Sequence, residues 1–134
     1  MSRDEVIRKA LRASVVFNLG GALLFLFPGS IGQLAGLPAE VPIVYRCTVA
    51  FLVTLFAGTY AWLARQPSLD RPLVGFAAVG KAGFFGVVLL CWLFGEASTP
   101  ALLGAGGDLG FAAIFAWWLL GDAAAPATST ALSA

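Results

Sequence analysis

The chain has 134 residues, of which 60% are hydrophobic and only 11% are charged, and its formal net charge is +1. Soluble domains carry about 25% charged residues, so the composition excludes an ordinary soluble protein, and the near-neutral charge argues against a nucleic-acid partner. The chain has no histidine, two cysteines and one methionine, so we predict no metal site and no cofactor.

Four apolar stretches determine the fold class. A helix needs about 20 apolar residues to span a hydrocarbon core of about 30 Å, and these stretches lack the alternation of barrel strands. We therefore predict an all-α integral membrane protein, a bundle of four transmembrane helices in one domain over residues 1–122, with the lipid bilayer as its solvent. The stretches are residues 13–27, 43–64, 73–95 and 101–121.

The first helix is predicted over residues 3–27 and begins before its apolar part. Ser2 and Glu5 have the spacing of a capping box. Asp4 and Arg8 are four residues apart, which favours an ion pair on the helix surface. The acidic residues near the start also favour a retained helix over a cleaved signal peptide.

The remaining helices are separated by links that contain proline and glycine. The link PGSIGQLAGLPAEVP, residues 28–42, is long for so small a bundle. It is either a cap over one end of the bundle, which we favour, or a functional loop. The last helix has Ser98 or Thr99 as its N-cap and Pro100 in its first turn. The other helices are predicted over residues 42–65, 72–95 and 100–121, followed by a flexible tail at 123–134.

Basic residues predict the orientation, because cytoplasmic links carry an excess of lysine and arginine. They stand at the start of the first helix and between the second and third helices, so both termini are predicted to be cytoplasmic, in a bacterial inner (plasma) membrane. Trp62, Trp117 and Trp118 then fall near the cytoplasmic interface, with Tyr45 and Trp92 at the other. The basic residues are Arg3, Arg8, Lys9, Arg12, Arg65 and Arg71.

Four polar side chains interrupt the apolar stretches: Asn18, Arg46, Lys81 and Asp108. At a rise of about 1.5 Å per residue they are staggered across the bilayer, in the order Arg46, Asp108, Lys81, Asn18 from the outer side. Their neighbours on the same helix faces are mostly small residues, which mark helix–helix contacts. We therefore expect these groups to point into the bundle.

Two interpretations of this polar cluster stay open. A lone charge at mid-membrane costs at least about 3 kcal/mol, so Asp108 is expected to pair with Lys81 or Arg46. The pair either fixes the register of the helices, which we favour, or forms part of an ion path, a proton path or a polar ligand pocket. No residue is assigned a catalytic role.

Cys47 and Cys91 lie near the outer ends of the second and third helices. A disulfide can form on that oxidising side, but neither residue belongs to a CxxC pair and free buried cysteine is common, so we favour two reduced thiols. Gly106 and Gly110 form a GxxxG pattern on the fourth helix, which is a weak indication of a helix contact.

The segments GALLFLFPG and GLPAEVPIVYR, followed by short-linked third and fourth helices, resemble those of small bacterial four-helix membrane proteins of the DoxX-like family. The resemblance covers most of the chain through helix spacing and the placement of Gly and Pro. It implies a quinone-linked role in sulfur oxidation, as in some members. Many members carry an acidic residue in the second helix, and residues 49–64 have none, so no catalytic residue is carried over.

These observations favour a non-enzymatic function. We expect a small accessory or structural subunit of a membrane assembly, whose partners are other membrane subunits or further copies of the chain. The small size of the chain and its missing cofactor ligands are the basis for this expectation. Two alternatives stay open: a small oligomeric transporter or channel that uses Asp108 and Lys81, and a quinone-linked or lipid-handling enzyme subunit.

Overall fold

The structure, a computed structural model, describes residues 1–122 and is all-helical over that range. Each of its four α-helices is long and apolar enough to cross a membrane, which confirms the predicted fold class. The helices begin and end within two residues of the predicted boundaries, and the predicted tail, 123–134, lies outside the described residues. The elements are α1 (Arg3–Leu26), the 3₁₀ helix η1 (Ile31–Ala35), α2 (Ile43–Leu63), α3 (Arg71–Leu93) and α4 (Thr99–Asp122).

Side-chain caps explain where three of these helices begin. The Ser2 hydroxyl accepts a hydrogen bond from the backbone N–H of Glu5, and the Glu5 carboxylate accepts one from the N–H of Ser2, which confirms the capping box. Asp70 caps α3 in a similar way. The Ser98 hydroxyl accepts a hydrogen bond from the N–H of Ala101 at 3.2 Å. Each cap pairs an N–H group that the helix itself leaves without a partner.

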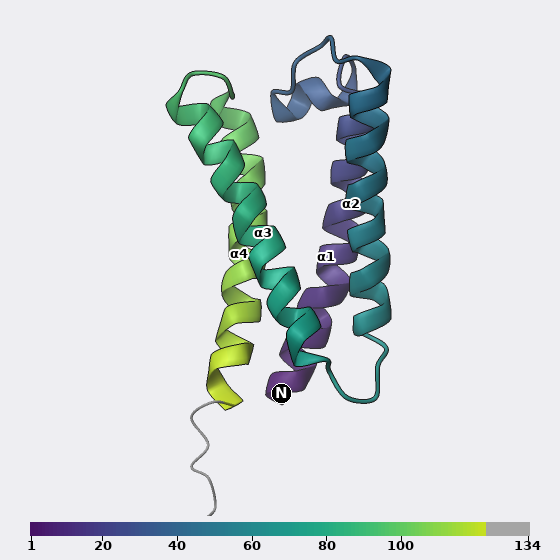
Figure 1. Ribbon diagram of the computed structural model, residues 1–134, viewed down its shortest axis with the longest axis vertical. Helices are drawn as coiled ribbons and strands as arrows, with labels where there is room; N and C mark the ends of the chain where they lie inside the picture. The colour runs from purple at the N-terminus through teal and green to yellow at the C-terminus, as the bar shows by residue number, and fades with distance from the viewer. Residues whose placement is uncertain (123–134) are drawn as a thin grey trace, which may run out of the picture.

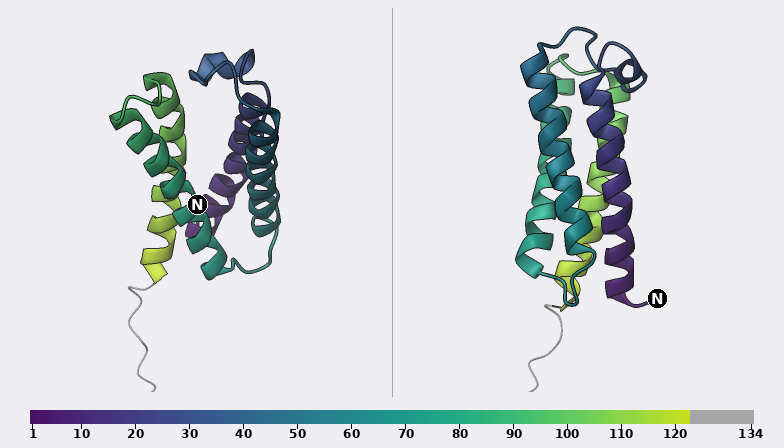
Figure 2. Two further views of the ribbon diagram at one scale, coloured as in Figure 1. Left: turned by 45° about the horizontal axis from the view of Figure 1, so that its top comes forward. Right: turned by 90° about the vertical axis from the view of Figure 1, so that its right-hand side faces the viewer.

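Two antiparallel hairpins make up the bundle. α1 packs along α2, α3 packs along α4, and α1 joins the hairpins by packing against α4. Figure 1 shows the hairpins converging at the end where the chain starts and diverging toward the end that carries η1, and Figure 2 shows the same arrangement from two further directions. We call these the N-terminal end and the η1 end. α2 and α3 approach each other less closely than the other neighbouring pairs, so the bundle is more open on that side.

The apolar core lies toward the N-terminal end, where the hairpins converge. α1 contributes a stripe of buried residues at intervals of three and four, from Ile7 to Ala22, so one face of the helix points inward. The part of this stripe nearer the N-terminal end packs in one cluster with Tyr60 on α2, Val74 on α3 and Phe115 on α4. The outward faces carry large exposed apolar side chains, as a lipid solvent requires.

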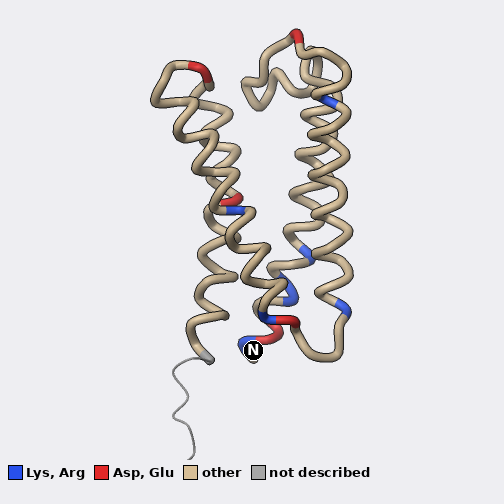
Figure 3. The backbone as a smooth tube through the Cα atoms, viewed as in Figure 1, with Lys and Arg blue, Asp and Glu red and all other residues tan. Residues whose placement is uncertain are grey.

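Arginine side chains tie the helix ends together at the N-terminal end, where Figure 3 shows most of the Lys and Arg positions. Arg3 and Arg71 each donate a hydrogen bond of 2.6 Å to a carbonyl near the end of α4. Arg8 donates one of 2.9 Å to the carbonyl of Ala64, just after α2. The carboxyl end of a helix carries partial negative charge, so cationic side chains are favourable there.

Two predictions for this end are wrong. Arg8 binds the end of α2, while the Asp4 carboxylate accepts a hydrogen bond from the Trp118 indole N–H at 2.9 Å, so the expected Asp4–Arg8 pair does not form. The side chain of Trp118 is only 4% exposed and belongs to the core, not to an interfacial belt. A surface pair contributes only about 0.2–0.5 kcal/mol, whereas a buried indole N–H requires a partner.

The link between α1 and α2 covers part of the η1 end. η1 packs against both α1 and α4, and the Ser98 hydroxyl donates a hydrogen bond of 3.0 Å to the carbonyl of Gly36. Gly36 has a φ of 68°, a left-handed conformation that glycine adopts without strain, and a Cβ at this position would overlap Ser98. The arrangement favours the interpretation of this link as a cap.

Candidate functional site

Lys81 of α3 is the centre of a buried polar cluster, which we define as Asn18, Lys81 and Asp108. The Lys81 residue is 3% exposed. Its ammonium donates one hydrogen bond of 2.6 Å to Asn18 Oδ1 and another of 2.6 Å to Asp108 Oδ1. Asn18 belongs to α1 and Asp108 to α4, so this single ammonium joins the two hairpins.

Asn18 extends the cluster to the remaining helix. Its Nδ2 donates a hydrogen bond of 3.3 Å to the backbone carbonyl of Val53 on α2. The cluster therefore involves all four helices, three through side chains and one through its backbone. Hydrogen bonds of this kind fix the rotation of each helix about its axis, because a turned helix would leave a polar group unpaired in hydrocarbon.

Aromatic rings surround the ammonium of Lys81. Its Nζ lies 4.9 Å from the ring centroid of Phe17, 5.2 Å from that of Phe111 and 5.5 Å from that of Tyr60. The electron-rich face of an aromatic ring attracts a cation within about 6 Å. The rings come from α1, α4 and α2, so each of the three other helices supplies one ring to the cation on α3.

A glycine on α4 allows this enclosure. A Cβ at Gly107 would lie 2.6 Å from ring atoms of Phe17, well inside van der Waals contact. Any larger residue at this position would displace the Phe17 ring from its place beside Lys81. Gly107 precedes Asp108, so the same turn of α4 provides both the carboxylate and the space for the ring.

The energetics of the cluster agree with its geometry. A single charged residue at mid-membrane costs at least about 3 kcal/mol, and charge-assisted hydrogen bonds are about twice as strong as neutral ones. The ion pair between Lys81 and Asp108, with side chains 2% and 10% exposed, offsets much of that cost. A buried pair of this kind is close to neutral against apolar residues, but loss of one partner costs about 3–5 kcal/mol.

Arg46 lies apart from the cluster, so of the two partners expected for Asp108 the structure has Lys81. It stands in the first turn of α2, near the η1 end, and is only partly buried. Among the described residues neither a hydrogen bond nor an ion pair joins it to Asp108, and its buried Nε has no hydrogen-bond partner. Its distance from mid-bundle explains this, because α4 and α2 belong to different hairpins that diverge toward this end.

Both cysteines are free. Cys47 is exposed on α2 and Cys91 is partly buried on α3. The two helices belong to different hairpins, and α2 and α3 do not pack closely. The thiols are therefore not joined in this structure.

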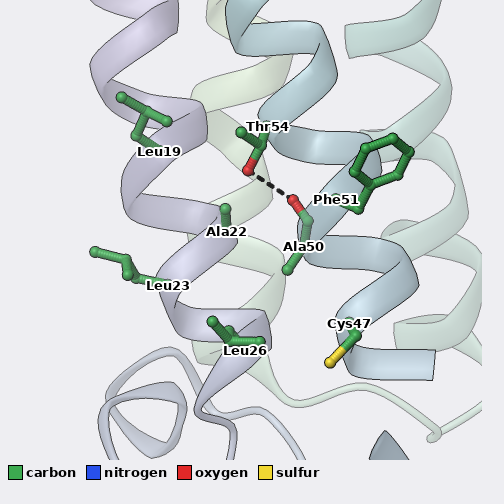
Figure 4. A pocket seen from close by; sticks show the side chains of 8 residues that line it. All are labelled: Leu19, Ala22, Leu23, Leu26, Cys47, Ala50, Phe51 and Thr54. Atoms are coloured by element: carbon green, nitrogen blue, oxygen red, sulfur yellow. Dashed lines mark hydrogen bonds between the residues drawn. The ribbon is translucent and has the colours of Figure 1, made fainter. Parts of the chain in front are cut away.

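Cys47 lines a shallow apolar groove between α1 and α2, shown in Figure 4. The floor contains small side chains, Ala22 and Ala50, and the only polar side chain besides the thiol is that of Thr54, whose hydroxyl donates to the Ala50 carbonyl at 2.8 Å. The groove contains no member of the polar cluster. Its lining is Leu19, Ala22, Leu23, Leu26, Cys47, Ala50, Phe51 and Thr54.

The GxxxG pattern of α4 lies outside the packing of the chain on itself. A Cβ at Gly106 or at Gly110 would have no atom within 4 Å, in contrast to Gly107. At about 100° per residue both glycines lie roughly opposite Asp108 on the helix, so they face away from the bundle. This pattern leaves an open strip beside α4 at these two positions.

Comparisons with protein-family models, with curated proteins and with solved structures found no match. Within residues 1–122, no three His, Cys, Asp or Glu side chains lie close enough together to hold a metal ion. The function must therefore be inferred from the arrangement of the residues themselves.

The sequence did not reveal the aromatic residues around Lys81. Phe17, Tyr60 and Phe111 are ordinary core residues by pattern, and the chain contains eleven phenylalanines. One available indication is position: Phe111 follows Asp108 by three residues, so the two side chains are neighbours on the surface of the helix.

Proposed function

We propose that this protein is a small, non-enzymatic subunit of a membrane assembly, and that α4 packs against a further transmembrane helix. The observation that carries the proposal is the open position of Gly106 and Gly110. Small residues at a spacing of four let two helix backbones approach closely in a bilayer. Because the chain does not use this strip for its own packing, a helix from another subunit or another copy of the chain can occupy it.

The polar cluster has a structural role in this proposal. Its three side chains bind one another, and the aromatic rings cover the ammonium. The remaining surface of the spans is mainly apolar, which suits contact with lipid and with partner helices. The cluster thereby fixes one packing of the four helices, and partner subunits bind to the outer surface of the bundle.

The experiment is native mass spectrometry of the tagged protein, expressed at normal level in its own host and extracted gently. We expect partner subunits or further copies at fixed stoichiometry. Gly106→Leu and Gly110→Leu should remove them. The matched control is Gly104→Leu on the same helix, where a Cβ also meets nothing within 4 Å but which faces the other way. A monomer in the wild type, or an assembly unchanged by both leucines, would contradict the proposal.

We also propose that the protein lies in a bacterial inner membrane with its N-terminal end toward the cytoplasm. The support is that most Lys and Arg positions lie at that end of the chain trace in Figure 3, since short cytoplasmic segments carry the excess of lysine and arginine. A fluorescent reporter that matures only in the cytoplasm, fused after the last residue, should be bright. A dark reporter at normal expression, together with activity of a periplasmic reporter at the same position, would contradict this orientation.

A second candidate, a small transporter or channel that uses Asp108 and Lys81, is favoured by one specific feature of the cluster. The Lys81–Asp108 bond lies within one hairpin, whereas the Lys81–Asn18 bond connects the two hairpins. A relative movement of the hairpins would break the second bond and keep the first, which is the kind of two-state element that alternating access requires.

Transport by purified protein in liposomes separates the two candidates. The transporter predicts ion or proton flux that Asp108→Asn abolishes while the fold remains intact. The subunit predicts no flux in the wild type, and loss of assembly or stability in the variant. The Asn18→Ala variant removes the bond between the hairpins together with the bond to the Val53 carbonyl. It should change the transport rate in the first case and only stability in the second.

A further inference from the structure

Ser14 of α1 carries a buried hydroxyl without a partner. The residue is 0% exposed, and its Oγ forms no hydrogen bond with any atom of the structure. Ser14 lies four residues before Asn18, so it is on the same face of α1, one turn nearer the N-terminal end. An unpaired hydroxyl in an apolar interior costs about 1–3 kcal/mol, and such a group in a folded protein calls for an explanation.

Two other hydroxyls in the spans show what an ordinary arrangement looks like. Thr54 donates to the carbonyl of Ala50 at 2.8 Å, and Thr59 donates to the carbonyl of Leu55 at 3.1 Å. Both use the carbonyl four residues earlier, which is the usual partner of a hydroxyl on a helix. Ser14 does not do so, because its buried Oγ has no hydrogen-bond partner, the carbonyl four residues earlier included.

Three of the four residues expected at the level of Ser14 have small side chains. Asn18 is bonded to Val53, and Lys81 is bonded to Asp108. Because the two helices of each hairpin are antiparallel, the residue four before the first partner lies at the same level as the residue four after the second. The level one turn below the cluster therefore contains one residue from each helix: Ser14, Ala57, Ala77 and Ala112. All four are buried, and three of their side chains are single methyl groups.

The cluster has one unused hydrogen-bond donor. The ammonium of Lys81 has three N–H groups, and the structure pairs two of them, with Asn18 and Asp108. Four residues of helix rise about 6 Å, and two hydrogen bonds of about 2.8 Å end to end span about 5.6 Å. The axial spacing of Ser14 and Asn18 along α1 is therefore of the size that one bridging water spans, and a buried water normally has two to four polar partners.

We propose that a water molecule binds between the Ser14 hydroxyl and the polar cluster, accepting a hydrogen bond from the Lys81 ammonium and pairing with Ser14 Oγ. Neither function proposed above requires this hydration site. The site adds one turn to the polar path inside the bundle, in the direction of the basic N-terminal end, and it keeps Lys81 in contact with an exchangeable molecule in the middle of the membrane span.

The chain offers a direct test, because Lys9 and Lys81 are its only lysines. The full-length protein, labelled with ¹⁵N at lysine and placed in lipid nanodiscs, gives two side-chain ammonium signals by nuclear magnetic resonance. Lys9 is exposed and serves as an internal reference, assigned with a Lys9→Arg variant. We expect a cross peak between water and the Lys81 ammonium in the wild type, and its loss in Ser14→Ala with the Lys9 signal unchanged.

The thermal unfolding midpoint of Ser14→Ala in the same nanodiscs is an independent measurement. The midpoint should fall if Ser14 holds a bound water, and it should stay unchanged or rise if the hydroxyl is simply unpaired. If Ser14 holds a water bound to the cluster, Ser14→Ala lowers the midpoint by several degrees, more than the control Thr54→Val, whose hydroxyl is already paired with its own helix. If the hydroxyl is simply unpaired, the alanine leaves the midpoint unchanged or raises it.

A wild-type spectrum without a water cross peak at Lys81 would overturn the proposal, and this measurement needs no variant to fold. So would a cross peak that persists at full intensity in Ser14→Ala, since the water would then be held elsewhere.

Discussion

Arg3 and Trp117, from the first turn of α1 and the end of α4, are in direct contact in two ways. The guanidinium of Arg3 donates a hydrogen bond of 2.6 Å to the Trp117 carbonyl, and its centre lies 4.5 Å from the centroid of the same indole ring. The contact joins the first and last helices at the N-terminal end. It complements the polar cluster, which joins the same two helices further along the bundle.

Arg3→Ala should lower the free energy of unfolding by about 1–2 kcal/mol, because it removes a charge-assisted hydrogen bond and a cation–π contact. Arg12→Ala is the matched control. Arg12 is exposed on the same helix, and its loss should change stability by less than about 0.5 kcal/mol. Titration with a denaturing detergent, followed by helical circular dichroism, measures both. Equal effects in the two variants would show that the Arg3–Trp117 contact is not stabilising.

Removal of one member of the buried ion pair should cost more than removal of both. Lys81→Met leaves the Asp108 carboxylate without an opposite charge, and Asp108→Leu leaves the Lys81 ammonium with only its bond to Asn18, so each should cost about 3–5 kcal/mol or abolish folding. The double variant replaces both charges with apolar groups of similar size and should recover much of this loss. The measurement is again detergent unfolding, analysed as a double-mutant cycle.

An additive double variant, as destabilised as the sum of the singles, would contradict the interpretation of the two residues as a pair. Arg46 provides the comparison within the spans. Because it forms no bond to Asp108 in the described structure, Arg46→Met should show no coupling to Asp108→Leu.

The fold could be predicted from the sequence because the hydrophobic stretches and the local capping motifs indicate the same four helices. The hydrophobic stretches require a bilayer and give the number of helices, and local motifs such as the capping box at Ser2 and Glu5 place the ends. These signals are local. They are sufficient here because every backbone N–H and C=O in hydrocarbon needs an internal partner, which a helix provides within a single segment. The hairpin pairing does not follow from the lengths of the links, because the long link of residues 28–42 joins two helices that pack together, whereas α2 and α3 are joined by a shorter link and do not pack closely.

The candidate site could be predicted only in part, since it depends on the rotation of each helix about its axis. Depth along a helix is a sum of residue rises, so Lys81 and Asp108 could be placed at similar levels. Rotation is fixed by side-chain packing, such as Phe17 against Gly107, which no local pattern encodes. The aromatic enclosure of Lys81 was therefore missed, and the choice between Lys81 and Arg46 as the partner of Asp108 stayed open.

Gly107→Ala should destabilise the protein, against the usual trend for glycine within a helix. Alanine is favoured over glycine in a helix by about 0.8–1.0 kcal/mol, but a Cβ at Gly107 would lie 2.6 Å from the Phe17 ring. Overpacking of this kind costs about 1–3 kcal/mol, so the net effect should be a loss. Gly104→Ala on the same helix meets no atom within 4 Å and should be neutral or stabilising. A stabilising Gly107→Ala would show that Phe17 is not held beside Lys81.

Ser98 connects the cap at the η1 end to α4, and its loss should loosen both. Its hydroxyl accepts a hydrogen bond from the N–H of Ala101 and donates one to the carbonyl of Gly36. Ser98→Ala should cost about 1 kcal/mol through the lost N-cap and should speed amide hydrogen exchange across η1. The control is Ser30→Ala, since Ser30 makes only a long bond of 3.4 Å to the carbonyl of Phe27. If exchange in η1 rises equally in both variants, the link is not anchored through Ser98, and the cap is held only by its apolar packing on α1.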